Sequence, residues 1–358
     1  MHSYMTTTPI LSVAIDTYNH ERYVEQAIVS VLEQDFPPTD FEIVVVDDGS
    51  TDRTPEIVRK FAPRVRLLQK KNGGQASAFN VVIPETHAEV VSFLDGDDWF
   101  ARGKLTKVMD ALADNEELSA VSHGRFHYHQ GTGEMTPYAP QERKFLSLAT
   151  PEAAREAFHA WPFLATSSVT VRKQLLNEIL PIPEALTFCA DGPIALASMA
   201  KGACILEQPL TYYRLHSANL CAVVDSKDAA RVRRRLEMSE LAFEMSLSLA
   251  SRLGVSPVVE RSFICPSWLV EANRQSLATY GGRRLDTLRT EMRCFRSDFD
   301  NPALPYRLFK YLIVAPATLM LPPRQFYKIR GWYGQRNLGR VRETFARSST
   351  VDARTRTS

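Results

Sequence analysis

Three carboxylates lie within four residues, Asp95-Gly96-Asp97-Asp98, at the point where an apolar segment of the sequence ends. Their negative charges repel one another unless a cation or hydrogen-bond donors neutralise them. Oxygen ligands at a partly hydrated site suit Mg²⁺ or Mn²⁺, and both ions also bind phosphates. The cluster therefore predicts a divalent metal site. The alternative is a solvated acidic turn in which Asp98 caps the next helix.

A second acidic cluster, DDGSTD at residues 47–52, follows the apolar segment FEIVVV. The carboxylates of Asp47 and Asp48 could accept hydrogen bonds from a base or a ribose, and Gly49 lets a ligand approach the backbone closely. The alternative is a turn whose side chains cap a helix. We favour this alternative for residues 50–52, and a ligand-binding role for Asp47 and Asp48.

Strands and helices alternate in the first part of the chain. Short apolar segments predict strands at residues 10–15, 41–47, 65–69 and 89–95. Apolar residues at helical spacing predict helices at residues 23–34, 53–62 and 76–83. This alternation is typical of an α/β fold whose mainly parallel sheet carries helices on both faces. Ligands bind outside the carboxyl ends of such strands, and each predicted strand ends in a polar cluster.

The later part of the chain has a weaker pattern. It predicts strands at residues 120–129, 167–172 and 205–215, and helices at residues 194–200, 226–253 and within 257–300. His123, His127 and His129 alternate along the first of these strands and could mimic a metal site. We interpret them as surface or core residues.

Four motifs in fixed order carry a resemblance to a known family. LSVAIDTYNHERYVEQAIVSVLEQ, EIVVVDDGSTDRT, NGGQASAFN and VVSFLDGDDWF resemble the motifs of family 2 glycosyltransferases over about residues 9 to 115. FCADGPIALAS and YYRLHSANLC extend the resemblance more loosely to about residue 222. The resemblance implies the Rossmann-like GT-A fold with a C-terminal helical extension. It also implies an inverting transfer of a sugar from a nucleotide diphosphate to an acceptor hydroxyl, with Mn²⁺ or Mg²⁺ as cofactor.

The resemblance also implies roles for individual residues. The donor site would contain Thr17, Tyr18, Asn19, Asp47, Asp48, Asn72, Gly73, Asp95 and Gly96, with Asp47 or Asp48 on the base and Asp95 facing the ribose or sugar. Asp97 would bind the metal with help from Asp98, and His216 of the YRLH segment would be a further ligand. Arg214 of the same segment is a candidate for a phosphate contact, because its guanidinium can pair with a phosphate. For His216, the alternative is a structural hydrogen-bond donor.

An inverting displacement also needs a base that takes the acceptor proton. Asp191 in the segment CADG resembles the acidic motif of the family, so it is the candidate catalytic base. The alternative is an Asp that only caps the following helix, although one Asp can do both.

The sequence departs from the family pattern at several positions. Asp16 stands where the family usually has Pro, and Phe79 stands where an Arg often precedes the Asn of the third motif. Val81 and Val82 occupy positions where a Gly is common, and Ala190 replaces an acidic neighbour of Asp191. The missing Arg implies that one expected diphosphate contact is lost.

Composition bounds the class of protein. The chain has 358 residues, 44% hydrophobic and 23% charged, which excludes collagen-like, low-complexity and wholly disordered chains. Five Cys residues without framework spacing favour a reducing compartment. The first ten residues resemble no secretory signal, so we expect a cytoplasmic location.

The C-terminal part is strongly basic. Residues 303–358 carry 11 Lys and Arg against two acidic residues, a charge of +9, whereas the rest of the chain carries −7. The apolar run at 311–323 is too short to span a membrane, which takes about 20 residues. Apolar and aromatic residues flanked by cations suit an anionic membrane interface. We therefore expect peripheral association with the cytoplasmic face of the membrane. The alternatives are a helical hairpin packed on the protein and, last, nucleic acid binding, for which no base-reading motif is present.

These patterns predict a domain organisation. Residues 1–8 are a flexible N-terminus and residues 9–222 a GT-A domain, with a nucleotide-binding half at 9–120 and an acceptor half at 121–222. A helical region at 223–300, a basic amphipathic segment at 301–346 and a disordered tail at 347–358 follow.

The predicted function is sugar transfer from a nucleotide diphosphate sugar, with a UDP-sugar as the first choice, to a sugar or a lipid-linked acceptor. The product would belong to a cell-surface polysaccharide or a glycolipid. A sugar nucleotidyltransferase is the alternative among enzymes, but it would carry a glycine-rich phosphate loop after the first strand, and DTYNHERY has no glycine. A non-catalytic nucleotide-sugar-binding protein would keep the pocket and lose the base.

Overall fold

The computed structural model describes residues 8–216, 219, 229–263, 267–298 and 316–330. The chain divides into two compact units, residues 1–226 with 237–268 and residues 227–236 with 269–358. The predicted tail at 347–358 lies outside the described residues, as do residues 1–7 of the predicted N-terminus and most of the basic segment at 301–346.

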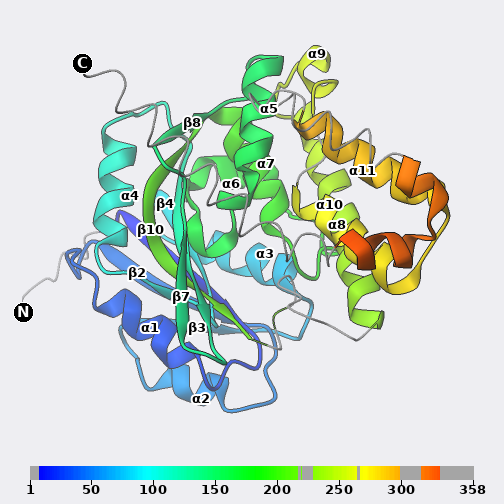
Figure 1. Cartoon of the computed structure of the whole chain (residues 1–358). Coiled ribbons are helices and arrows are strands. Elements are labelled where there is room, and N and C mark those ends of the chain that lie inside the picture. The colour runs from blue at the N-terminus through cyan, green and yellow to red at the C-terminus, as the bar shows by residue number, and fades with distance from the viewer. Residues whose placement is uncertain (1–7, 217–218, 220–228, 264–266, 299–315, 331–358) are drawn as a thin grey trace, which may run out of the picture. The chain divides into compact units, whose positions relative to one another are not determined.

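The first unit is built on a ten-stranded sheet (Figure 1). Its strands are β1 (Leu11–Thr17), β2 (Phe41–Asp47), β3 (Val65–Gln69), β4 (Val90–Asp95), β5 (Trp99–Phe100), β6 (Ala120–His129), β7 (Glu134–Tyr138), β8 (Lys144–Leu146), β9 (Thr170–Arg172) and β10 (Ala203–Leu215). The order is β3-β2-β1-β4-β9-β6-β10-β5, with β7 beside β6 and β8 beside β10. The strand order reverses direction at β1. In sheets of this kind, ligands bind outside the carboxyl ends of the strands at such a point.

Helices cover both faces of this sheet (Figure 1). The α-helices that lie wholly in the unit are α1 (Val24–Leu32), α2 (Thr54–Arg59), α3 (Gln75–Glu85), α4 (Lys104–Ala113), α5 (Pro151–Ala160), α6 (Lys173–Ile179), α7 (Asp191–Lys201) and α9 (Pro257–Glu260). Side chains of α1, α2 and α4 form one core with one face of the sheet, and those of α3, α5, α6 and α7 form a second core with the other. Along β1, Val13 and Ile15 enter the first core and Ala14 enters the second, as the two-residue period of a strand requires.

The predicted α/β fold is confirmed, with one correction to the sheet. The pairs among β1, β2, β3 and β4 are all parallel. The other half is mixed, because β9 pairs antiparallel with both β4 and β6, whereas β6 and β10 run parallel. β9 is the three-residue end of the strand predicted at 167–172, whereas β7 carries mostly polar, exposed side chains and lacks the apolar run that predicts a buried strand.

The second unit is helical in the described residues. The long helix α8 (Ala229–Ala250) contributes its first residues to this unit, and α10 (Ser267–Tyr280) and α11 (Arg284–Asp298) follow. Residues 316–320 and 323–330 are also helical. Among the described helices, none combines the length and the apolar character that crossing a membrane requires.

A buried carboxylate organises this second unit. Glu291 receives Nε and Nη2 of Arg274 at 3.0 and 3.1 Å, the hydroxyl of Tyr327 at 3.2 Å and a donor of Arg330. Burial, with the negative charge of Glu291 adding, raises the pKa of Tyr327. Phe326 is buried beside these groups in the chain. The part of the basic segment that the structure describes thus packs on α11, as the hairpin alternative predicts.

Candidate active site

The carboxyl ends of β1 and β4 form the centre of the site. Asp16 and Asp95 are register partners on these neighbouring strands, and the Gly96 N–H donates to the Asp16 carbonyl at 2.8 Å. A Cβ on Gly96 would lie 2.7 Å from Thr17 Oγ1 and 2.8 Å from His20 Nδ1. Only glycine fits there, so the acidic turn after β4 packs directly on the loop after β1.

Asp97 and His216 meet across this edge. His216 Nε2 lies 2.9 Å from Asp97 Oδ2, and His20 Nε2 lies 3.9 Å from the same oxygen. Burial raises the pKa of Asp97, but the hydrogen bond to His216 and the charges of His20 and His216 outweigh burial and lower it below its ordinary value. The two predicted metal ligands, which are more than a hundred residues apart in sequence, are therefore adjacent. His20 was not singled out from the sequence, although it lies in the DTYNH segment after the first strand.

Asp98 is turned into the protein. Its Oδ1 accepts the Arg214 N–H at 2.9 Å, and its buried Oδ2 has no hydrogen-bond partner among the described residues. Burial, with the charge of Asp97 adding, raises the pKa of Asp98 well above its ordinary value. The alternative in which Asp98 caps the next helix is wrong, because α4 begins at Lys104 after Gly103.

Arg214 holds the acidic turn of residues 95–98 in place. Its Nε donates to the Asp97 carbonyl at 2.7 Å, and its Nη2 donates to Gln26 Oε1 at 2.6 Å. Its guanidinium carbon also lies 4.5 Å from the ring centre of Trp99 and 4.7 Å from that of Tyr23. These contacts to protein groups favour a positioning role over the predicted phosphate contact.

Gln75 connects Asp95 to the predicted base. Its Nε2 donates to Asp95 Oδ1 at 3.1 Å, and its Oε1 accepts the N–H of Ala190 at 3.0 Å, one residue before Asp191. The Ser167 hydroxyl donates to the other oxygen of Asp95 at 3.2 Å. The sequence signal for Gln75 was present in NGGQ, directly before the third predicted helix, whereas Ser167 lies in a region without a motif.

Asp191 is the first residue of α7. Burial raises the pKa of its carboxylate to about 6, although the nearby backbone of Thr166 opposes the increase. The charge of Asp191 in turn raises the pKa of Asp95, after burial and the charges of Asp16, Asp98 and Asp97. Asp191 therefore belongs to the same acidic cluster.

Asp16 is the departure from the family pattern with the clearest physical consequence. Burial raises its pKa to about 7, and its Oδ1 has no partner among the described residues. The unfolded chain releases this proton near pH 4 and the folded chain holds it to about pH 7, so stability falls as the pH rises through this window.

In EDTA, we expect wild type to lose about 2–4 kcal/mol more stability than Asp16→Asn between pH 5 and pH 8. Urea unfolding at both pH values measures this, and equal losses would refute the assignment.

Asp47 and Asp48 are buried in turns of the protein itself. Asp47 accepts the N–H of Ser50 at 3.1 Å. Asp48 accepts Lys70 Nζ at 2.5 Å and the N–H of Gly74 at 2.7 Å. The turn-forming role that we assigned only to residues 50–52 thus also holds for Asp47, and Asp48 anchors the loop before α3. A contact of either carboxylate with a base stays a prediction.

The remaining donor-site candidates lie in these same loops. Asn19, whose φ of 56° is left-handed, accepts the Thr51 N–H at 2.8 Å through its side chain and so joins the loops after β1 and β2. A Cβ on Gly49 would lie 2.7 Å from the Asn72 nitrogen, which brings the loop containing Asn72 and Gly73 against the loop after β2. Thr17 is buried, and Tyr18 is 43% exposed.

Phe79 in the motif NGGQASAFN is another departure from the family pattern. Phe79 is buried and packs on Phe93 with ring centres 5.0 Å apart, so this position of α3 faces the core and not the site. Its neighbour Asn80 donates to the Ile182 carbonyl at 2.8 Å and accepts the Ile182 N–H at 2.7 Å. Asn80 thus anchors the segment that leads to Asp191.

Metal coordination at this site would involve the side chains of Asp97 and His216. Among the described residues, no group of three or more His, Cys, Asp or Glu side chains is arranged to hold a metal ion. Asp97 and His216 alone offer one oxygen and one nitrogen ligand. Mg²⁺ is commonly held by one or two protein groups together with substrate phosphates and water. The pair fits a metal that arrives with a diphosphate.

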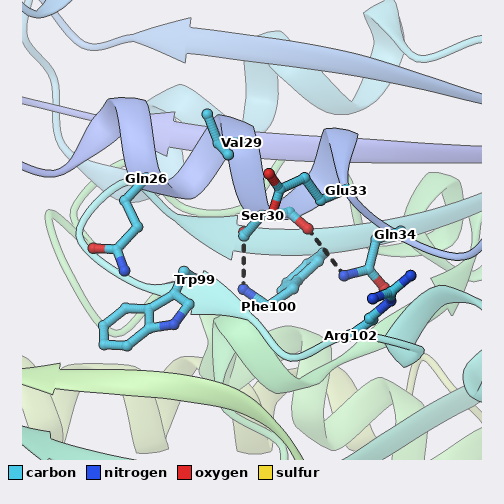
Figure 2. A pocket seen from close by; sticks show the side chains of 8 residues that line it. All are labelled: Gln26, Val29, Ser30, Glu33, Gln34, Trp99, Phe100 and Arg102. Atoms are coloured by element: carbon cyan, nitrogen blue, oxygen red, sulfur yellow. Dashed lines mark hydrogen bonds between the residues drawn. The ribbon is translucent and has the colours of Figure 1, made fainter.

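A separate pocket lies between α1 and β5 (Figure 2). It has a volume of about 670 Å³ and contains none of the predicted site residues. Figure 2 shows Gln26 and Trp99 at one end and Gln34 and Arg102 at the other. Ser30 and Gln34 are hydrogen-bonded to each other and to the backbone around Phe100. The pocket adjoins the site through Gln26 and Trp99, both of which contact Arg214.

Comparisons with known proteins agree with this geometry. Residues 12–180 match the sequence model described as Glycosyl transferase family 2. The chain is 32% identical over 238 residues to the uncharacterized glycosyltransferase alr2836 of Nostoc sp., covering 64% of this chain and 73% of that protein. Over 98 residues it is 41% identical to the poly(ribitol-phosphate) beta-N-acetylglucosaminyltransferase TarS of Staphylococcus aureus, covering 26% of this chain and 17% of TarS.

A solved structure shares the fold. Residues 1–349 of S. aureus TarS in complex with UDP-GlcNAc match with a TM-score of 0.51 and 20% identity, over 80% of this chain and 88% of that one. At this identity the match concerns the fold alone. The family match, the extent of the Nostoc relative and the acidic cluster at the carboxyl edge of the sheet together establish that the chain belongs to glycosyl transferase family 2.

Proposed function

We propose that this glycosyltransferase moves a sugar, with inversion, from a UDP-sugar to an acceptor hydroxyl with the help of Mn²⁺ or Mg²⁺. One observation carries the proposal. Asp97 and His216 meet at the same strand edge at which Gln75 joins Asp95 to the residue preceding Asp191. Groups suited to a diphosphate, a sugar and a proton therefore lie together. The TarS structures in complex with UDP-GlcNAc and with UDP support the choice of UDP as the nucleotide.

In the proposed reaction, the acceptor oxygen attacks the anomeric carbon while the bond from that carbon to the diphosphate oxygen breaks. Asp191 takes the proton of the acceptor hydroxyl. Its pKa of about 6 leaves it ionised at neutral pH, yet basic enough to share the proton in the transition state. Asp95, held by Gln75 and Ser167, would orient a hydroxyl of the donor. When bound by Asp97 and His216, the metal would supply Lewis-acid neutralisation of the leaving diphosphate.

The alternatives differ in what they do after binding. A sugar nucleotidyltransferase would consume a nucleoside triphosphate, and a binding protein would leave the donor intact. A thermal-shift panel separates the donor bases first, because ligand binding raises stability by mass action. We expect UDP and UDP-GlcNAc, with Mn²⁺ present, to raise Tm more than the ADP, GDP, CDP and TDP compounds. Equal shifts for all bases, or no shift with any, would count against the proposal.

The proposed base predicts the pH dependence of transfer. Protonated Asp191 cannot accept a proton, so kcat/KM should fall as the pH decreases through its pKa of about 6. Below that pH, we expect a decrease of about tenfold per pH unit, with a plateau above it. Initial rates of UDP release between pH 4.5 and 8 measure the profile. A profile that stays flat from pH 5 to 8 would remove Asp191 from the role of base.

We further propose peripheral membrane association and a lipid-linked or polymeric acceptor in surface polysaccharide or glycolipid synthesis. Within the described part of the basic segment, Met320 is 74% exposed and Ile329 52% exposed, and the exposed cations Arg324 and Lys328 lie close to them in sequence. Apolar and cationic groups on two successive helical segments suit an anionic interface. Sedimentation with vesicles containing phosphatidylglycerol tests this, with neutral vesicles as control, and equal sedimentation or none would contradict it.

A further inference from the structure

A cationic and aromatic cluster lies on β6, β7 and β10. Arg125 on β6 lies opposite Tyr138 on β7 and Thr211 on β10 in the sheet register. Its guanidinium carbon lies 4.9 Å from the ring centre of Tyr138 and 5.5 Å from that of Tyr213. His127, two residues further along the same strand face, stacks on Tyr138 at 5.2 Å. These side chains are all half-buried, so each keeps part of its surface open.

Arg125 has unused hydrogen-bonding capacity. Its Nε donates to His127 Nε2 at 3.2 Å, and its Nη1 donates to the Pro162 carbonyl at 2.8 Å. His127 can accept because burial, with the charge of Arg125 adding, lowers its pKa to about 4 and keeps it neutral. Within the described residues, Arg125 has no ion pair with a carboxylate. A guanidinium carries five N–H groups, so most of its donors and its whole charge remain for a ligand.

The cluster is joined to the proposed base by one short loop. This loop runs from η1 (Trp161–Phe163) to η2 (Thr166–Ser168). Its Pro162 carbonyl receives Arg125, its Phe163 ring stacks on Tyr138 at 4.9 Å, and its Thr166 backbone lies close enough to Asp191 to lower the pKa of that carboxylate. The positive charge of Arg125 also lowers the pKa of Asp191, against the larger effect of burial.

This location points to the acceptor. The acceptor hydroxyl must reach Asp191 in the proposed reaction, and the donor diphosphate is expected on the side of Asp97 and His216. The surrounding cluster of five Asp side chains repels an anionic acceptor unless a cation compensates. Arginine suits this role because its planar fork pairs with both oxygens of a carboxylate or phosphate. The exposed parts of the half-buried aromatic rings beside it offer an apolar surface for the C–H face of a sugar.

We propose that Arg125, Tyr138 and His127 form an acceptor subsite for a saccharide or polyol that bears a phosphate or carboxylate. Arg125 pairs with the anion, and Tyr138 with its stacked neighbours packs against the carbon skeleton. The proposal deepens the proposed function and depends on it.

The test uses small probes and the full chain saturated with UDP and Mg²⁺. Ligand-observed NMR gives the Kd of glucose 6-phosphate, glucuronate, glucose and inorganic phosphate. Because Arg125 can make charge-assisted hydrogen bonds to an anion, we expect at least one anionic sugar to bind about tenfold or more tightly than glucose. Preference for glucose 6-phosphate assigns a phosphate-bearing acceptor, and preference for glucuronate assigns a carboxylate-bearing one. Equal Kd values for all three sugars would overturn the proposal, as would inorganic phosphate binding as tightly as either anionic sugar.

Variants show whether the preference resides in this cluster. Arg125→Met should remove the preference, and Arg125→Lys, which keeps the charge without the fork, should keep part of it. Arg64→Met is the matched control, because Arg64 also lies over an aromatic ring, that of Phe41 at 5.5 Å, but is exposed and outside the site. Persistence of the full preference in Arg125→Met would contradict the proposal. Tyr138→Leu should weaken binding of charged and neutral sugars alike, and unchanged binding of both would contradict its packing role.

The Kd of UDP is measured first in every variant. If wild type binds no UDP, the proposed function fails before the subsite is tested. If wild type binds UDP and no sugar probe shows a charge preference, the subsite alone fails.

Discussion

Replacing Asp191 with Asn lowers kcat by about 10²–10⁴-fold, the usual contribution of a general base, while the Kd of UDP stays within about twofold of wild type. Asn has nearly the same shape and can still occupy the first turn of α7, but it cannot take up a proton. In the proposed reaction Asp191 takes the acceptor proton and makes no contact with UDP, so its replacement should leave the Kd of UDP unchanged. Single-turnover transfer assays and calorimetry with UDP measure the two effects separately.

Asp191→Glu is the matched comparison for this first prediction. It keeps the ionisable group and moves it by one methylene, so we expect a smaller loss than in Asp191→Asn. Thermal unfolding should show both variants folded, because relieving a buried charge does not remove a stabilising ion pair. Normal turnover in Asp191→Asn would mean that another group, or water, accepts the proton.

Replacing Asp97 with Asn is expected to abolish the increase in UDP affinity that Mn²⁺ gives to wild type, and to lower kcat/KM by about 100-fold or more. Asn offers a neutral carbonyl oxygen in place of a carboxylate and leaves only His216 as an adjacent ligand. The hydrogen bond that His216 makes to Asp97 also holds the imidazole in place. Calorimetric titration of UDP, with and without Mn²⁺, gives the affinity change directly.

Asp52→Asn is the matched control for the Asp97 variant. Asp52 lies in the loop after β2, where it accepts hydrogen bonds from Thr54 and from the N–H of Glu21 in the loop after β1. It should retain the effect of Mn²⁺ on UDP binding. A wild-type effect of Mn²⁺ that survives unchanged in Asp97→Asn would place the metal elsewhere.

The first half of the fold could be predicted from the sequence because its elements are locally encoded. The strand at Phe41–Asp47 is apolar throughout, and the helix at Val24–Leu32 has a buried stripe at the expected spacing. The second half could not be predicted at the same level. Its strands β7 and β8 are short and were not predicted. A strand was predicted at 167–172, but the antiparallel pairing of β9 with β4 and β6 depends on residues that are distant in sequence.

The site shows the same division between local and long-range information. The clustering of Asp16 with Asp95 follows from two parallel strands in register, which the alternation of strands and helices predicts. The contact of His216 with Asp97 was expected only through the family resemblance, since no local pattern places residues 119 apart within 2.9 Å. Gln75, Ser167 and Arg125 escaped notice because their roles arise from where β6 and the loop before β9 lie in three dimensions.

The most direct test of the account follows the anomeric proton of the donor by ¹H NMR. UDP-GlcNAc, in which the sugar is α-linked, is incubated with the full chain, Mg²⁺ and a mixture of anionic and neutral acceptor sugars. We predict that the donor signal decays, that UDP appears, and that the new glycosidic signal has the large coupling of a β-linkage. A product with retained α-configuration would contradict the proposed inversion. If neither UDP-GlcNAc nor another nucleotide sugar were consumed with Mg²⁺ or with Mn²⁺, the proposed sugar transfer itself would be contradicted.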